Sequence, residues 1–141
     1  MKKVLIFYAS YGGGHLSAAK SIKQYLEDNY KDLQIEMIDC IKYINNALDK
    51  VTTGAYRQMA KLFREYRPDI VISTHPFSSQ MTSYLKQKGK TNCKLVTVLT
   101  DFAEHEQWLI GNYFVDLYFV SNDKMKRNMV ENTIFQKRRF L

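Results

Sequence analysis

Three consecutive glycines followed by a histidine form the part of this sequence whose residue types point most directly to chemistry. Gly12, Gly13 and Gly14 stand between an apolar run and a helical pattern, and His15 follows them. Glycine permits positive φ and close approach of the backbone, and the helix that begins here offers exposed N–H groups and a positive dipole end. That dipole keeps an imidazole neutral, so His15 is a candidate general base for a hydroxyl. A tight turn without a ligand is the alternative interpretation.

A second candidate segment contains His75, Pro76 and Phe77. Proline pushes the residue before it into an extended conformation, which exposes the imidazole of His75 at the end of a short apolar run. We expect His75 and Phe77 to line a ligand cleft. A loop histidine without a role, beside an aromatic ring that covers the core, is the competing interpretation.

A third candidate segment is the polar and aromatic stretch that begins at Thr100. Asp101 is placed to accept a ring N–H from His15 or from His105 and so to fix a tautomer, and capping the next turn is an equal alternative. Trp108, together with Phe77 and Phe102, is expected to form an apolar platform for a sugar or a glycerol group. Such aromatic side chains also cover hydrophobic cores.

The elements that must position these residues alternate between strands and helices. Apolar or alternating runs predict strands at 4–9, 34–39, 69–73, 94–99 and 115–120, and apolar spacing of three and four predicts helices from 15 to about 29–32, over 41–66 with a break around 52–54, at 78–88 and at 122–131. This order predicts an α/β fold, a Rossmann-like, doubly wound and mostly parallel sheet. Ligands bind at the carboxyl ends of such strands, where all three candidate segments fall.

The composition of the chain limits the kinds of partner that the protein is expected to bind. The 141 residues suit one domain, and the net charge of +7 favours an anionic partner such as a membrane surface or a phosphorylated ligand. No apolar stretch approaches the roughly 18 residues of a spanning helix, and no leader peptide is visible. The basic amphipathic pattern at 56–67 fits core packing or a helix lying on an anionic membrane. Cys40 and Cys93 lack ligand spacing, so we expect core thiols and no metal site.

Four segments together resemble a known family, and they cover most of residues 3–130. These segments are YASYGGGHLSAAKSI, RPDIVISTHPF, LVTVLTDFAEHEQW and VDLYFVSNDKMKRNM. They are similar to the amino-terminal domain of the monogalactosyldiacylglycerol synthases and of the processive diacylglycerol glucosyltransferases. The chain looks shorter than that family between about 53 and 61.

The resemblance implies half of a two-domain, GT-B type glycosyltransferase. The amino-terminal half would bind diacylglycerol and an anionic membrane, and the other half would bind a nucleotide-sugar such as a UDP-hexose. Transfer would proceed with inversion and without a cofactor or catalytic metal. Residues 1–132 would form the acceptor domain and 133–141 a basic tail, so without the donor domain we expect no efficient activity. The enzyme would be cytoplasmic and peripheral at the inner face of the cell membrane.

The resemblance also assigns residues. His15 matches the histidine that is proposed as base or acceptor-orienting group, and Asp101 joins it as a catalytic candidate. Thr100, His105 and Trp108 match the segment near the acceptor. The acceptor-binding candidates are therefore Gly12, Gly13, Gly14, His75, Phe77, Thr100, His105 and Trp108.

Two other classes of function stay open at this level. Gly12, Gly14 and Asp39 match part of a dinucleotide-binding fingerprint of an oxidoreductase, although Ser17 stands where the third glycine belongs. A non-enzymatic basic module is the other possibility, but no signature of a nucleic-acid-binding domain supports a nucleic-acid partner.

Overall fold

The computed structural model describes residues 1–45, 52–103 and 105–131, and within these ranges the chain forms one parallel sheet. Its strands lie in the order β2-β1-β3-β4-β5, and each neighbouring pair is parallel. The strands are β1 (Lys2–Tyr8), β2 (Leu33–Asp39), β3 (Ile70–Ser73), β4 (Lys94–Val98) and β5 (Leu117–Phe119). The predicted α/β class is confirmed. The order reverses between β1 and β3, which is where ligands bind in open parallel sheets.

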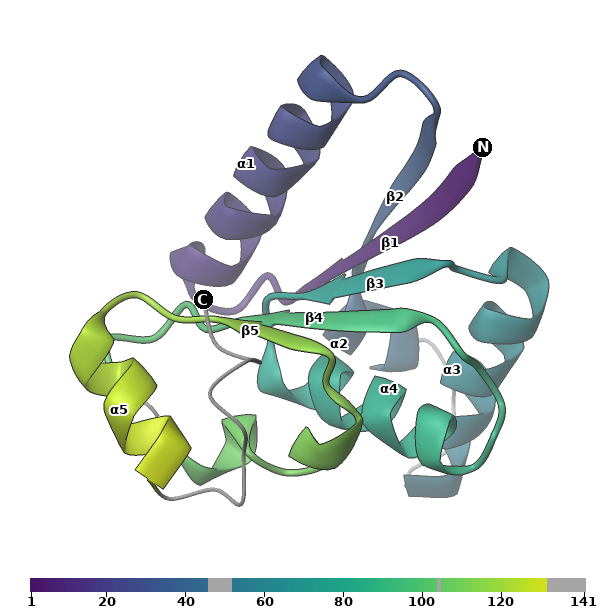
Figure 1. Cartoon of the computed structure of the whole chain (residues 1–141). Helices are drawn as coiled ribbons and strands as arrows, with labels where there is room; N and C mark the ends of the chain where they lie inside the picture. The colour runs from purple at the N-terminus through teal and green to yellow at the C-terminus, as the bar shows by residue number, and fades with distance from the viewer. Residues whose placement is uncertain (46–51, 104, 132–141) are drawn as a thin grey trace.

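Helices cover both faces of this sheet (Figure 1). α1 (Gly13–Asn29) lies on one face, while the other face carries α3 (Thr52–Tyr66) and α4 (Pro76–Gln87). The other helical segments of the described ranges are α2 (Cys40–Asn45), α5 (Asp123–Glu131) and the 3₁₀ turns η1 (Glu106–Trp108) and η2 (Asn112–Phe114). No helix in the described ranges is both long and apolar enough to cross a bilayer.

β1 shows why an unbroken apolar run forms the centre of the sheet. Val4 and Ile6 pack with Ala19 of α1, whereas Leu5 and Phe7 pack in the larger cluster on the opposite face. Successive side chains of a strand point to opposite faces, so a strand that is covered on both sides must be apolar at every position. The four side chains are at most 1% exposed.

The helix α3 uses its apolar side for the core. Met59, Leu62, Phe63 and Tyr66 belong to the larger hydrophobic cluster and are at most 9% exposed. Of the two interpretations of this amphipathic segment, core packing is therefore the one that the structure supports. Since these four side chains are buried in the core, they are not available to lipid.

The predicted elements are present, with differences at their ends. The break expected around 52–54 is wrong, because these residues belong to α3. α4 begins at Pro76 rather than at residue 78, since proline suits the first helical position and the ring of His75 caps the helix. The final strand has three residues instead of six. The basic tail at 133–141 lies outside the described residues.

The two cysteines match the expectation of core thiols. Cys40 and Cys93 are buried and free, and burial raises the pKa of Cys40 to about 12. Neither is a reactive thiolate at neutral pH.

Candidate functional site

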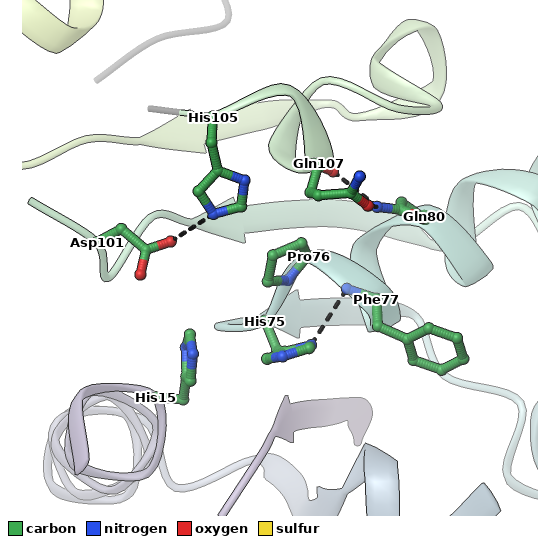
Figure 2. Close-up of a pocket in the computed structure, with 8 residues that line it drawn as sticks. All are labelled: His15, His75, Pro76, Phe77, Gln80, Asp101, His105 and Gln107. Atoms are coloured by element: carbon green, nitrogen blue, oxygen red, sulfur yellow. Dashed lines mark hydrogen bonds and ion pairs between the residues drawn. The ribbon is translucent and has the colours of Figure 1, made fainter. Parts of the chain in front are cut away.

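The loops that follow β1, β3 and β4 meet around a cavity of about 310 Å³ at the carboxyl edge of the sheet. β3 lies between β1 and β4, so the three predicted segments are neighbours in space. Eight residues line the cavity: His15, His75, Pro76, Phe77, Gln80, Asp101, His105 and Gln107 (Figure 2). Its volume is at the lower end of the range for small-molecule sites.

The glycine loop shapes the turn that leads into α1. Gly12 has φ 83°, a conformation that favours glycine, and it precedes the first residue of the helix. A Cβ on Gly14 would lie 3.7 Å from the carbonyl oxygen of Thr100, in ordinary contact. The glycines are not among the described residues that line the cavity. Their direct role in acceptor binding therefore stays a prediction, whereas their effect on the position of His15 is visible.

The contacts of His15 determine which ring nitrogen carries the proton. Nδ1 lies 2.5 Å from the carbonyl oxygen of Thr74 and 2.7 Å from Oγ1 of Thr100. A carbonyl oxygen can only accept a hydrogen bond, so Nδ1 must be the donor. In the neutral ring Nε2 is then the unprotonated nitrogen, which is the atom that a general base needs.

Thr74 and Thr100 hold His15 from two different loops. Oγ1 of Thr74 donates to the backbone carbonyl oxygens of Phe7 and His15, at 3.1 and 2.9 Å. Thr100 adds a hydrogen bond to the carbonyl oxygen of Thr74 at 3.4 Å. The ring is thus held by groups that follow β3 and β4, and Thr74 is itself tied to Phe7 of β1.

His75 has the opposite tautomer. Its Nδ1 accepts a hydrogen bond from the backbone N–H of Phe77 at 3.2 Å and caps α4, so the proton of the neutral ring is on Nε2. The rings of His75 and His15 are T-shaped, with centroids 4.8 Å apart. Burial, and then the charge on His15, lowers the pKa of His75 to about 4. His75 is therefore neutral at physiological pH.

Asp101 orients His105, which decides between the two alternatives for its partner. Oδ2 of Asp101 lies 3.0 Å from Nε2 of His105 and accepts a hydrogen bond of 2.6 Å from Nε1 of Trp108. His15 takes its orientation from the two threonines instead. The carboxylate and the ring of His105 both face the cavity (Figure 2).

The structure corrects the expectation for Trp108. Its side chain is 0% exposed and belongs to the core, so it offers no platform on which a sugar or glycerol could stack. It supports the site indirectly, because its indole N–H holds Asp101. Phe77 does line the cavity, whereas Phe102 is fully exposed to solvent.

Sequence reasoning missed Gln80 and Gln107. Nε2 of Gln80 donates to the carbonyl oxygen of Gln107 at 2.8 Å and to its Oε1 at 3.1 Å, which joins α4 to η1 at the rim of the cavity. A single glutamine in an amphipathic helix gives no motif. The available signal was spacing, since Gln80 lies one helical turn beyond Pro76 and so shares its side of α4.

The structure argues against the alternative that this chain binds a dinucleotide, because the carboxylate of Asp39 is engaged elsewhere. Oδ1 of Asp39 accepts hydrogen bonds of 3.1 Å from the backbone N–H groups of Ile41 and Lys42, and the residue is only 9% exposed. A carboxylate that caps a helix in this way is not presented to a ribose. In the part of the chain that the structure describes, no three metal-ligating side chains gather to hold an ion.

Comparison with known families gives a match over most of the chain. The family model described as monogalactosyldiacylglycerol (MGDG) synthase matches residues 15–67 and 57–139. Processive diacylglycerol beta-glucosyltransferases of Bacillus cereus (strain 03BB102) and Bacillus thuringiensis (strain Al Hakam) are each 28% identical over 163 residues. Each alignment covers 92% of this chain and 41% of the relative, so this chain spans less than half of their length.

A solved structure has the same fold. The apo form of the lipopolysaccharide outer core galactosyltransferase WaaB matches with a TM-score of 0.68 and 14% sequence identity. The match covers 100% of this chain and 44% of that protein. It agrees with the α/β fold described above.

Proposed function

Because this chain belongs to the monogalactosyldiacylglycerol synthase family, we propose that it is the acceptor-binding part of a glycosyltransferase that transfers a hexose to diacylglycerol. The relatives named above support this acceptor, since they are processive diacylglycerol glucosyltransferases. The site lies at the carboxyl edge of a parallel sheet, where such folds bind ligands.

The single observation that carries the proposal is the orientation of His15. Its Nδ1–H is directed to Thr74 and Thr100, which leaves the unprotonated Nε2 on a ring that lines the cavity. A hydroxyl in the cavity would find a fixed proton acceptor, and general base catalysis of this kind contributes about 100- to 10,000-fold.

The proposed reaction is one displacement at the sugar carbon. Nε2 of His15 takes the proton of the acceptor hydroxyl, while the hydroxyl oxygen forms a bond to the anomeric carbon. The bond from that carbon to the phosphate breaks, and the nucleoside diphosphate leaves with the electron pair. Attack opposite the leaving group inverts the configuration. The proton stays on the imidazolium, whose Nδ1–H still donates to the carbonyl oxygen of Thr74.

Asp101 supplies the negative charge that this step requires nearby. Its carboxylate lines the same cavity as His15, so it favours the imidazolium that forms when the acceptor is deprotonated. Trp108 and His105 fix its position through hydrogen bonds of 2.6 and 3.0 Å. We propose that Asp101 acts in this electrostatic way, and that His105 and Phe77 contact the acceptor.

The sugar donor would be bound by a second domain. We propose a UDP-hexose as donor and no catalytic metal. This chain covers 41% of the length of its curated relatives, and we propose that the cavity described here binds the acceptor. The chain alone would then have no efficient transferase activity, and it would regain activity when joined to a donor domain.

The acceptor would be reached from a membrane surface. The two acyl chains of a diacylglycerol would remain in the bilayer while the glycerol enters the cavity. Tyr11 and Phe102 are exposed in the loops after β1 and β4, at the same edge of the sheet, and exposed aromatic residues suit a lipid interface. The net charge of +7 would draw the protein as a whole to the anionic, inner face of the cell membrane.

Flotation with liposomes tests the proposed acceptor. Phosphatidylcholine vesicles with and without diacylglycerol, and with and without anionic lipid, are mixed with the chain and with a Tyr11→Ser, Phe102→Ser variant. We expect binding that rises with diacylglycerol and falls in the variant. Binding that follows the anionic lipid alone, at equal levels with and without diacylglycerol, would contradict a diacylglycerol site.

A further inference from the structure

The rings of His15 and His75 offer complementary hydrogen-bonding atoms to the cavity. His15 donates through Nδ1 to Thr74, so its Nε2 can only accept. His75 accepts through Nδ1 from Phe77, so its Nε2 can only donate. Both rings line the cavity and their centroids are 4.8 Å apart. Figure 2 shows them on the same side of the cavity, beneath Asp101 and Pro76.

The donor character of His75 does not depend on the protonation of its neighbour. Burial, together with the charge on His15, lowers the pKa of His75 to about 4. A proton on His15 therefore makes it harder to protonate His75, and the second ring stays a single donor through the proposed reaction. Its other nitrogen stays committed to the cap of α4.

A ligand that satisfies both rings must carry a hydroxyl and a separate acceptor close to it. The hydroxyl gives its hydrogen to Nε2 of His15, and the second group accepts from Nε2–H of His75. In a 1,2-diacylglycerol the carbon beside the free hydroxyl carries an ester, whose carbonyl oxygen is a strong acceptor without a hydrogen. An ether at that position lacks this oxygen.

We propose, resting on the proposed function, that Nε2–H of His75 binds an ester carbonyl of the acceptor lipid and so selects acyl esters over ethers. His15 recognises the reacting hydroxyl, and His75 recognises the ester next to it. Together they set the distance between the two groups, which places the hydroxyl at the base.

The tautomers are the first test, and they need no ligand. In the isotope-labelled chain at neutral pH, two-bond hydrogen–nitrogen NMR correlations separate protonated from unprotonated ring nitrogens. We expect the proton of His15 on Nδ1 and the proton of His75 on Nε2. A proton on Nδ1 of His75 would leave no donor for the ester and would overturn the proposal.

The second test compares a diester with its ether. The binding of monomeric 1,2-dihexanoylglycerol and 1,2-dihexylglycerol to the chain is followed by NMR shift titration. The variant is His75→Ser, because serine preserves a cap for α4 and removes the ring donor. We expect the wild type to prefer the diester by roughly 2- to 12-fold, as for one net hydrogen bond, and the variant to bind the two ligands equally.

The outcomes separate this proposal from the proposed function. Equal binding of both ligands by the wild type would overturn the ester-reading role and leave a diacylglycerol site. An equal loss for both ligands in the variant would show a role in folding only, and would also overturn it. Binding of neither ligand would contradict the proposed acceptor, and this inference would fail with it.

Discussion

A cavity lies at each end of the parallel sheet, and the polar side chains of the two cavities differ in their hydrogen-bond partners. The cavity at the amino-terminal end measures about 350 Å³ and is lined by Phe63, Arg67, Pro68, Asp69, Lys90, Thr91, Asn92 and Cys93. Its groups support the backbone: Oδ2 of Asp69 accepts from the N–H of Lys3 at 2.7 Å, and Oγ1 of Thr91 accepts from the N–H of Cys93. At the carboxyl end the backbone occupies Nδ1 of His15 and Nδ1 of His75, and the Nε2 of each of these two rings is left for a ligand.

This difference shows that volume alone does not identify a site. The amino-terminal cavity is slightly larger, and it also contains a strained residue, Arg67, with φ 54°. That strain has a structural cause, since Arg67 turns the chain from the end of α3 toward β3. The carboxyl end is distinguished by titratable rings whose tautomers are fixed by neighbouring carbonyl and amide groups.

The largest expected effect concerns His15. In a chimera that joins this chain to the donor half of the Bacillus cereus relative, His15→Ala should lower turnover about 100- to 10,000-fold, because the general base is lost. Glycosyl transfer to diacylglycerol in mixed micelles is the measurement. Asn92→Ala, at the other end of the sheet, is the matched control and should leave turnover within two-fold, about 0.4 kcal/mol. A comparable loss of turnover in both variants would contradict the proposed difference between the two ends of the sheet.

A pair of glycines separates backbone strain from function. Gly12 and Gly89 have φ of 83° and 65° and lie at opposite ends of the sheet. Replacing either with alanine should destabilise the chain by about 1–2 kcal/mol, since both would place a Cβ in a left-handed conformation. Urea unfolding measures this cost. Gly12 leads directly into the helix that carries His15, so a shift of the backbone at this position would move the ring, and only Gly12→Ala should weaken binding of dihexanoylglycerol.

The depressed pKa of His75 predicts how stability depends on pH. Its ordinary value of 6.5 is lowered to about 4 in the folded chain. Between these values the unfolded chain binds a proton that the folded chain does not, so stability falls as the pH drops through this window. From about pH 7 to about pH 4.5, the wild type should lose about 1 kcal/mol more than His75→Ser, after allowance for solvent screening. Urea unfolding at both pH values checks this, and equal losses would contradict a neutral, half-buried ring.

The smallest expected effect is a gain in stability at the amino-terminal end. Arg67→Gly removes the left-handed strain that follows α3 and supplies the residue that helices favour there. The gain should be about 0.5–1 kcal/mol by urea unfolding, less than the strain relieved because glycine is more flexible in the unfolded chain. Ligand binding at the carboxyl end should not change. A loss of ligand affinity would connect the two ends and contradict their independence.

Much of this arrangement followed from the sequence because parallel sheets obey simple rules. The apolar runs around Val4 and Val71 could only be strands buried on both faces, and their carboxyl ends had to meet at one edge. His15, His75, Asp101 and His105 are therefore found around one cavity, as their places after strands suggested.

The remaining details depend on packing that the sequence does not encode locally. Trp108 was expected to form a platform for a sugar or a glycerol group, but its ring is buried in the core and only its N–H group contacts a residue of the site, Asp101. Asp101 had two possible ring partners, and the direction of its loop selected His105. Gln80 and Gln107 meet because α4 packs against η1, a contact between segments with no shared motif.

The two hydrogen bonds of His15 have a consequence for how the protein is made. They join residues that are 59 and 85 positions apart in the chain, so they form only after the strands that carry Thr74 and Thr100 have docked in the correct order. Contacts of such long range follow loop closure during folding. During synthesis, the ring of His15 therefore cannot be oriented by Thr100 until β4 and the loop after it have left the ribosome. A chain whose strands have paired in the wrong order would lack the two hydrogen bonds that orient His15. The proposed base is therefore positioned only in the correctly folded protein.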